Sequence, residues 1–304
     1  MAALSAADAR ARTLAIVALL AGATCIGTSA LFVKVSEAGP VSTAFWRVFL
    51  ALPFLWVWAW TAQRNQPPAQ SNPRALLFAA GFFFAGDLAV WHWSIVLTSV
   101  ANAVLLANLA PIFVTLAAWW LWRKKPAAMF LAGLLAALIG VMLMVGGDFS
   151  NTGGRALLGD ALGVVTAMFY AAYQLTVTRL RGTVSTARIM AISSTVTAAF
   201  LLPLAWLSAE MFFPVSGVGW AKVFGLALIS QVAGQSLIAY AMAHLPATLS
   251  SVGLLLQPVM AGLFAWILLG ETLGAVAIAG AVLVLIGIRI ATLAESKTYT
   301  KEPQ

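Results

Sequence analysis

The sequence is poor in charged residues, in cysteine and in histidine. Of its 304 residues only 9% are charged while 62% are hydrophobic, whereas about 25% of the residues in a typical soluble protein are charged. A water-soluble fold of this size could not bury so much apolar surface. The single cysteine, Cys25, excludes an intrachain disulfide and a multi-cysteine metal site, and two histidines leave little material for zinc or hydrolytic chemistry.

Motifs of phosphate-binding and hydrolytic enzymes are missing as well. The sequence contains no Walker loop, no His-Glu-x-x-His and no convincing Ser/His/Asp set. We therefore expect no enzyme, no cofactor and no bound metal. The formal net charge of +8 would suit a nucleic acid, but the basic residues lie between apolar runs, which indicates membrane topology instead. The expected partners are membrane lipid and a small-molecule substrate, with a monomer as the working unit and no nucleic acid.

The hydrophobic residues that are present fall into ten long runs. Each run is close to the roughly 20 residues with which a helix crosses about 30 Å of hydrocarbon. Strands of a membrane barrel would alternate apolar and polar residues, whereas these runs are apolar on every face. The predicted spans are residues 13–36, 41–62, 74–97, 99–122, 126–146, 156–180, 184–208, 217–243, 247–269 and 273–293. The chain is thus predicted to be an all-α integral membrane protein.

The basic residues predict which side of the membrane each loop faces. If the N-terminus is cytoplasmic, the inner segments contain Arg10, Arg12, Arg64, Arg74, Arg123, Lys124, Lys125, Arg179, Arg181, Arg188, Arg289, Lys297 and Lys301. The outer segments then contain only Lys34, Arg155 and Lys222. This bias follows the positive-inside rule for an even number of spans with both chain ends inside.

The chain repeats itself. A shift of 147 residues aligns Pro111 with Pro258 and Trp119 with Trp266, and a shift of 143 places 41–44 on 184–187. We assign the first repeat to residues 1–148, the second to 149–293, and a cytoplasmic tail to 294–304. Because each repeat holds five spans, the second must enter the membrane from the opposite side.

The loops agree with this inversion. The loop after the fourth span is basic, Arg123-Lys124-Lys125, whereas its counterpart, Gly270-Glu271-Thr272, is acidic. Inverted repeats are the architecture of many alternating-access transporters, which bind substrate near the middle of the membrane. The fold and the repeat together favour a transporter over a passive scaffold.

Two segments resemble a known family. Residues 247–287 contain Leu256-Gln257-Pro258, the run Trp266 to Glu271, and the glycines Gly280 and Gly287, and residues 102–140 repeat this pattern. The chain thereby resembles the drug/metabolite transporter superfamily, in particular its EamA-type ten-helix exporters. It departs from the family at Arg123-Lys124, where Gly-Glu is common. The neighbourhood of Trp91-His92-Trp93 looks most like exporters of aromatic amino acids. The resemblance implies export of small organic metabolites across a bacterial inner membrane.

Polar and aromatic side chains within the spans are the candidates for substrate binding. They are Trp46, Asp87, Trp91, His92, Asn102, Asn108, Tyr170, Tyr173, Gln174, Gln235, Tyr240 and Gln257. Asp87 lies in mid-span, where a charge costs about 2.5–3.5 kcal/mol on insertion scales. It is either a site for a proton or a substrate amine, or a structural carboxylate. His92 lies some 140° around the helix from Asp87, which disfavours a direct proton relay between them.

Other residues allow two interpretations each. His92 and its flanking tryptophans either enclose a flat substrate or belong to an aromatic belt at the membrane surface. Arg47 either extends outward to the interface or holds a carboxylate. Pro111 and Pro258 are predicted to break their helices and to gate the cavity, although a single proline can also be a harmless kink. Gly133 with Gly140, and Gly280 with Gly287, are predicted to pack span four on five and span nine on ten.

The leading hypothesis is a secondary exporter of aromatic or other hydrophobic amino acids that works by alternating access. One alternative is efflux of hydrophobic cations or toxic compounds, for which Asp87 would be the selective charge. Alternatives from other classes are a non-transporting scaffold or sensor and an intramembrane enzyme. Proton coupling and transport driven by the substrate gradient alone both remain open from the sequence.

Overall fold

The computed structural model describes residues 6–63, 73–123, 125–146, 153–181, 183–270 and 273–299. Helices and short connections make up all of these segments, and none of them contains a strand. Ten helical spans are long and apolar enough to cross a membrane: Arg10–Lys34, Pro40–Ala62, Arg74–Leu97, Asn102–Trp122, Ala128–Val145, Gly154–Leu180, Thr186–Leu207, Gly217–Ala241, Ala247–Leu268 and Ala275–Glu295. The predicted all-α membrane fold is confirmed, with span ends within a few residues of those expected.

Six spans are single helices and four are interrupted. The single helices are α1 (Ala6–Lys34), α4 (Arg74–Leu97), α7 (Ala128–Val145), α8 (Gly154–Leu180), α9 (Thr186–Leu207) and α14 (Ala275–Tyr299). The interrupted spans are α2 (Pro40–Phe49) with α3 (Leu52–Gln63), α5 (Val100–Ala107) with α6 (Ala110–Trp122), and α12 (Ala247–Gly253) with α13 (Leu256–Leu269). The eighth span joins α10 (Gly217–Leu226), the π-helical segment η1 (Ala227–Gln235) and α11 (Ser236–Ala241).

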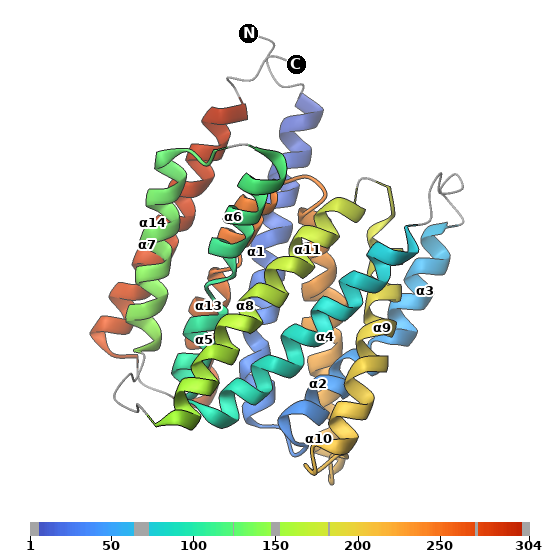
Figure 1. Cartoon of the computed structure of the whole chain (residues 1–304). Helices are drawn as coiled ribbons and strands as arrows, with labels where there is room; N and C mark the ends of the chain where they lie inside the picture. The colour runs from blue at the N-terminus through green and yellow to red at the C-terminus, as the bar shows by residue number, and fades with distance from the viewer. Residues whose placement is uncertain are drawn as a thin grey trace.

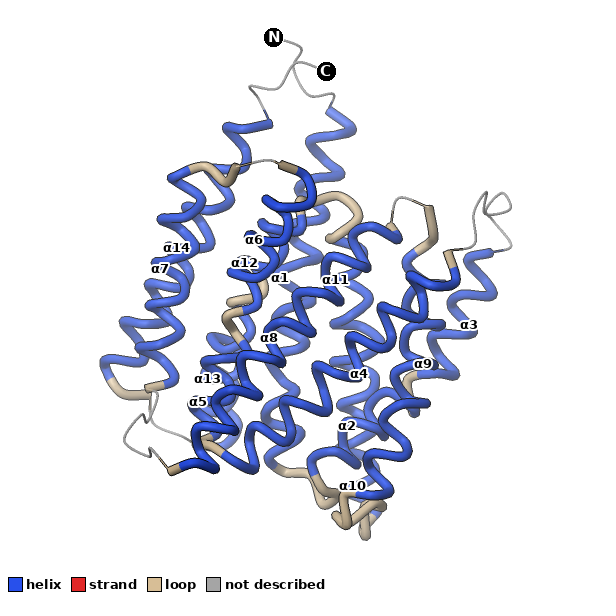
Figure 2. Tube along the Cα trace, viewed as in Figure 1, coloured by secondary structure: helices blue, strands red, loops and turns tan. Residues whose placement is uncertain are grey.

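The helices run roughly along one direction, and the start of α1 and the end of α14 lie at the same end of the bundle (Figures 1 and 2). Helix α1 runs away from that end and α8, which begins the second half, runs towards it. The two five-span halves are therefore inverted. Several residues that supported the orientation lie outside the described residues: Arg64, Lys124, Glu271, Thr272 and Lys301. The cytoplasmic location of the chain ends remains a prediction from charge.

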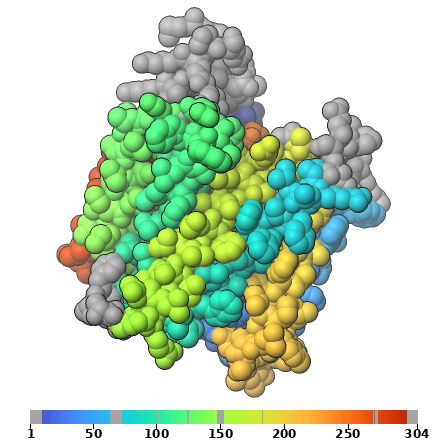
Figure 3. Space-filling model, viewed as in Figure 1, coloured from blue at the N-terminus to red at the C-terminus, as the bar shows by residue number. Residues whose placement is uncertain are grey.

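The outside of the bundle is apolar. Trp120 and Leu207 are each 78% exposed, and many other large hydrophobic side chains are exposed on the spans. Figure 3 shows one face of this surface, formed by α4, α6, α8 and α9. In water such a surface would be a severe liability, whereas hydrocarbon solvates it. The apolar exterior is thus the expected lipid-facing surface of a multi-pass membrane protein.

Glycines bring α7 and α14 into close contact. A Cβ atom on Gly140 would lie 2.6 Å from the carbonyl oxygen of Gly280, and one on Gly133 would lie 2.7 Å from that of Gly287. The glycines therefore join span five to span ten, and the expected pairing of four with five and nine with ten was wrong. Small residues at helical spacing predict that a helix packs closely, but they do not identify its partner.

We expect Gly140→Ala to destabilise the protein. In an isolated helix this change would be favourable by about 1 kcal/mol. Here the new methyl group would overlap the backbone of α14, at a cost of about 1–3 kcal/mol. Gly154→Ala, where no atom lies within 4 Å of the added Cβ, is the matched control. Thermal midpoints in detergent, measured by size-exclusion chromatography after heating, should fall for Gly140→Ala and not for Gly154→Ala; a raised midpoint for Gly140→Ala would contradict the packing.

Two groups of three spans form the walls around the centre of the bundle. In one group α8 packs against α4, α5 and α6, and in the other α1 packs against η1, α11 and α13. The two groups are equivalent in the repeat. Spans three (α4), four (α5 and α6) and six (α8) correspond to spans eight (η1 and α11), nine (α13) and one (α1). Helix α9 packs along α2, α3 and α4 at the side. This arrangement leaves a space between the two groups.

Candidate functional site

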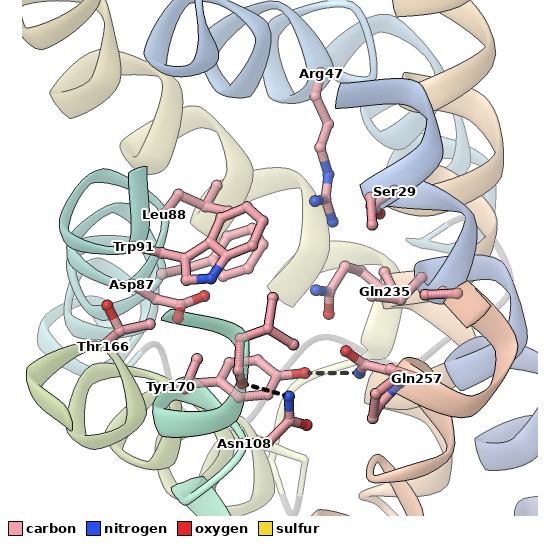
Figure 4. A pocket seen from close by; sticks show the side chains of 18 residues that line it. Ser29, Arg47, Asp87, Leu88, Trp91, Asn108, Thr166, Tyr170, Gln235 and Gln257 are labelled. Atoms are coloured by element: carbon pink, nitrogen blue, oxygen red, sulfur yellow. Dashed lines mark hydrogen bonds between the residues drawn. The ribbon is translucent and has the colours of Figure 1, made fainter. Parts of the chain in front are cut away.

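A cavity of about 170 Å³ lies between the two groups. Seven spans contribute to it, through α1, α2, α4, α5, α8, η1 and α13. Its polar lining residues are Ser29, Arg47, Asp87, Asn108, Thr166, Tyr170, Gln235 and Gln257 (Figure 4). A central cavity shared by both halves is the position in which transporters with inverted repeats bind substrate.

Two opposite charges line this cavity. Arg47 reaches it from α2 and is only 7% exposed, with its Nε donating a hydrogen bond of 3.2 Å to Oε1 of Gln231. The carboxylate of Asp87 lies on the wall formed by α4, and the guanidinium group extends into the cavity (Figure 4). Within the described residues neither side chain forms a salt bridge, with the other or with a third group. Arg47 therefore does not extend to the interface, and the site offers both a donor fork for an anion and an acceptor for a cation.

Aromatic rings stand beside these charges. Trp91 lies one helical turn after Asp87, so both side chains face the cavity. Phe84 and Tyr170 also line it. The ring of Tyr173, buried behind the lining, stacks on Phe84 at 4.8 Å and lies 6.2 Å from Tyr170. A flat apolar group would find ring faces next to both charges.

The two spans that contain Pro111 and Pro258 are interrupted at equivalent positions. Helix α5 ends at Ala107 and α6 begins at Ala110, while α12 ends at Gly253 and α13 begins at Leu256. In the first break Leu109 N–H bonds to the carbonyl of Leu106 at 3.1 Å. In the second, Leu255 N–H bonds to that of Val252, also at 3.1 Å. Proline has no N–H and clashes with the preceding turn, so it cannot continue the ladder. The predicted helix breaks are confirmed.

Polar side chains at the breaks face the centre of the molecule. Asn108 donates to the carbonyl of Val104 at 2.8 Å, and Gln257 donates to the hydroxyl of Tyr170 at 3.5 Å (Figure 4). Pro258 lines the main cavity. Pro111 and Gln174 line an adjoining cavity of about 20 Å³ that shares Asn108, Tyr170 and Gln257 with the larger one. The breaks thus form part of the cavity wall.

Five of the sequence candidates lie away from the cavity lining. Trp46 donates to the carbonyl of Phe212 at 2.8 Å within an aromatic cluster. His92 is buried and its Nδ1 bonds to the carbonyl of Leu88. Asn102 donates to Asp160 at 3.2 Å, Tyr173 lies in the core, and the ring of Tyr240 lies 4.7 Å from that of His244. These residues miss the cavity because of the helix face on which they lie: a polar residue at the right depth can still point away from the centre of the bundle.

The structure adds lining residues that the sequence did not indicate. Ser29, Ile26 and Gly27 of α1 line the cavity, as does Thr166 of α8, whose buried hydroxyl has no hydrogen-bond partner among the described residues. Small residues carry no chemical signal of their own. The repeat does indicate these positions. The shift of 143 residues aligns Gly27 with Tyr170, so aligning the candidate residues with the other repeat would have identified α1 as part of the cavity wall.

At the end of the bundle away from the chain termini, two loops are joined. Glu37, in the loop between α1 and α2, accepts hydrogen bonds from the hydroxyl of Ser216 at 2.5 Å, from its N–H at 2.8 Å, and from the N–H of Val215 at 3.0 Å. These bonds hold the pKa of Glu37 below its ordinary value, with the Ser216 hydroxyl as the largest cause. Gly39 N–H also bonds to the carbonyl of Met211 at 2.9 Å. The loop between α1 and α2 is thereby attached to the loop between α9 and α10.

Comparison with known proteins agrees with this architecture. One solved crystal structure matches with a TM-score of 0.77 and 19% identity, covering 94% of this chain and 98% of its own. A protein of Archaeoglobus fulgidus named only as an uncharacterized transporter is 24% identical over 270 residues, which cover 87% of this chain and 92% of the relative. The pseudopaline exporter CntI of Pseudomonas aeruginosa is 25% identical over 224 residues, 73% of this chain and 75% of the exporter.

The sequence model of the EamA-like transporter family matches the chain twice, over residues 13–146 and 157–293. Together the two matches cover nearly all of the ten spans. The cavity between inverted halves, the paired helix breaks and these matches lead to one conclusion, that the chain belongs to the EamA-like transporter family.

Proposed function

We propose that the protein is a secondary exporter of aromatic or other hydrophobic amino acids, acting by alternating access in a bacterial inner membrane. The observation that carries this proposal is the pair of unpaired charges, Arg47 and Asp87, on the wall of a cavity with aromatic lining. An amino acid brings a carboxylate for the guanidinium group, an ammonium for the carboxylate, and an apolar side chain for the rings. Buried charges without partners are costly, and such a substrate would satisfy both at once.

The direction of transport and the setting are part of the same proposal. A relative named as a pseudopaline exporter supports outward movement of a metabolite. The apolar exterior supports direct contact with lipid, and because one chain contains the whole cavity, a monomer suffices for transport.

Efflux of hydrophobic cations is the second candidate function. Asp87 favours this function, because it is the acidic side chain in the described lining of the cavity and could bind a cation. Proteoliposomes that contain the purified protein should be tested with a panel of amino acids and aromatic cations. Uptake of amino acids, with weak competition by cations, is the expected result. If neither amino acids nor related aromatic compounds move, the proposed function is wrong.

Alternating access requires that the central cavity open to one side at a time, and the paired breaks at Pro111 and Pro258 are suited to bending. We expect Pro111→Ala and Pro258→Ala each to slow transport by about tenfold, because alanine restores the amide and removes the clash that keeps the helix open. The control is Pro203→Ala, which alters a proline inside the uninterrupted helix α9 that lines neither cavity. Initial rates of phenylalanine uptake at matched protein content are the measurement. Undiminished rates for both variants would end the hinge hypothesis.

A further inference from the structure

Gln231 is completely buried and lies behind the cavity wall, next to Arg47. Its side-chain amide has two partners: Oε1 accepts from Nε of Arg47 at 3.2 Å, and Nε2 donates to the hydroxyl of Ser194 at 3.2 Å. Arginine can only donate, so the amide oxygen must face Arg47 and the orientation of the amide is fixed by chemistry. Ser194 and Gln231 thus form a short chain of hydrogen bonds that ends on the arginine.

This chain determines which part of the guanidinium group is free. The group is planar and carries five N–H donors, and the one on Nε is occupied by Gln231. The four remaining donors belong to the two terminal nitrogens, which form the fork that matches the two oxygens of a carboxylate. Because Nε is tied to η1, the fork is directed into the cavity (Figure 4).

A competing arrangement exists within the same cavity. Asp87 also lines it, and the long side chain of arginine has the freedom to turn towards an opposite charge. An ion pair between Arg47 and Asp87 would neutralise both charges and leave nothing for a substrate. The bond to Gln231 opposes this collapse. Gln231 lies within the π-helical segment η1, and such wide turns occur often at functional sites.

We propose that Gln231 is a positioning residue that makes the cavity selective for carboxylate-bearing substrates by holding the fork of Arg47 in place and apart from Asp87. This proposal rests on the proposed function, because it explains how an amino-acid exporter would reject simple amines. It predicts that a negative charge at position 231 would take the place of the substrate carboxylate. The site would then retain only Asp87 and prefer amines.

Three aromatic probes separate the two charges of the site: phenylalanine, phenethylamine, which lacks the carboxylate, and phenylacetate, which lacks the ammonium group. Binding of each is measured on the purified full-length protein in detergent, and phenylalanine and phenethylamine uptake is measured in proteoliposomes. We expect Gln231→Glu to weaken phenylacetate binding at least tenfold while phenethylamine binding is kept or tightened. In Gln231→Leu both phenylacetate and phenethylamine should bind more weakly, because Arg47 is then free to pair with Asp87.

Two further variants separate positioning from mere stability. Ser194→Ala removes the second partner of Gln231 and should weaken phenylacetate binding several-fold, and it serves if Gln231→Glu does not fold. Thr197→Val alters a buried hydroxyl on the same helix, α9, that bonds to the carbonyl of Gly81 at 2.9 Å rather than to Gln231. This control should leave the ratio of phenylalanine to phenethylamine uptake unchanged.

The outcomes distinguish this inference from the proposed function. Loss of phenylacetate binding in the Gln231 variants of a protein that moves no amino acid would refute the function and keep the inference. Phenylalanine uptake by the wild type, with an unchanged uptake ratio in Gln231→Glu, would refute the inference and keep the function. A wild-type protein that does not bind phenylacetate would also overturn the inference.

Discussion

Export of phenylalanine should fall by about tenfold or more when Asp87 is replaced by asparagine, because a hydrogen bond to a charged group contributes about 1.5–3 kcal/mol. Asp87 is the acidic group in the described lining of the cavity, and it forms no salt bridge with any described side chain. Asparagine has nearly the same shape but carries no charge. The loss should therefore appear in transport rather than in folding. Initial rates of export from proteoliposomes are the measurement.

The matched control is Asp160→Asn. Asp160 is also a carboxylate near apolar spans, but it accepts hydrogen bonds from Thr98 at 2.6 Å and Asn102 at 3.2 Å and does not line the cavity. This variant should transport phenylalanine at nearly the wild-type rate. Equal rates for Asp87→Asn and the wild type would show that Asp87 binds no substrate amine.

The same variant tests proton coupling. If Asp87 carries a proton, an imposed pH gradient should accelerate export by the wild type and have no effect on Asp87→Asn. If the substrate gradient alone drives transport, the pH gradient should affect neither protein. A response to the gradient that persists in Asp87→Asn would assign proton transfer to another group.

The ten spans and both helix breaks could be predicted from the sequence because each depends on a local property, and the inversion followed from a repeat of five spans. Length and hydropathy determine whether a run can cross lipid, and proline within a helix removes a backbone hydrogen bond and favours a break or kink. The interior of the bundle is different. Nearly all faces of these helices are apolar, so hydropathy does not show which face meets lipid and which meets protein. For that reason the partner of α7 and the position of Trp46 in an aromatic cluster away from the cavity were not predictable.

The repeat shows where function departs from symmetry. The shift of 143 residues that places 41–44 on 184–187 also places Arg47 on Met190. Met190 is fully buried in the apolar core with Ile189 and Tyr173. One half of the duplicated fold thus retains an apolar residue where the other half has a charge. The helix breaks, which both halves share, support movement, whereas Arg47 occurs once and is suited to recognition.

This comparison supplies the second substitution with a large expected effect. Arg47→Met places in the first half the residue that the second half already accommodates at the equivalent position, so the fold should tolerate it. Phenylalanine export should fall by about tenfold or more, because the carboxylate loses hydrogen bonds to a charged group worth about 1.5–3 kcal/mol. Phenethylamine, which has no carboxylate, should be exported at least as well as by the wild type.

Two companion variants make the result specific. Arg47→Lys keeps the positive charge but loses the planar fork, so it should retain part of the phenylalanine rate. Arg155→Met removes an exposed basic residue near the start of α8, outside the cavity lining, and should leave export unchanged. A proportional fall of phenylalanine and phenethylamine export in Arg47→Met would mean that the guanidinium group supports the fold without choosing the substrate. A selective loss of phenylalanine export would instead show that Arg47 determines the choice of substrate. The residue that differs between the two repeats would then be the one that recognises the substrate.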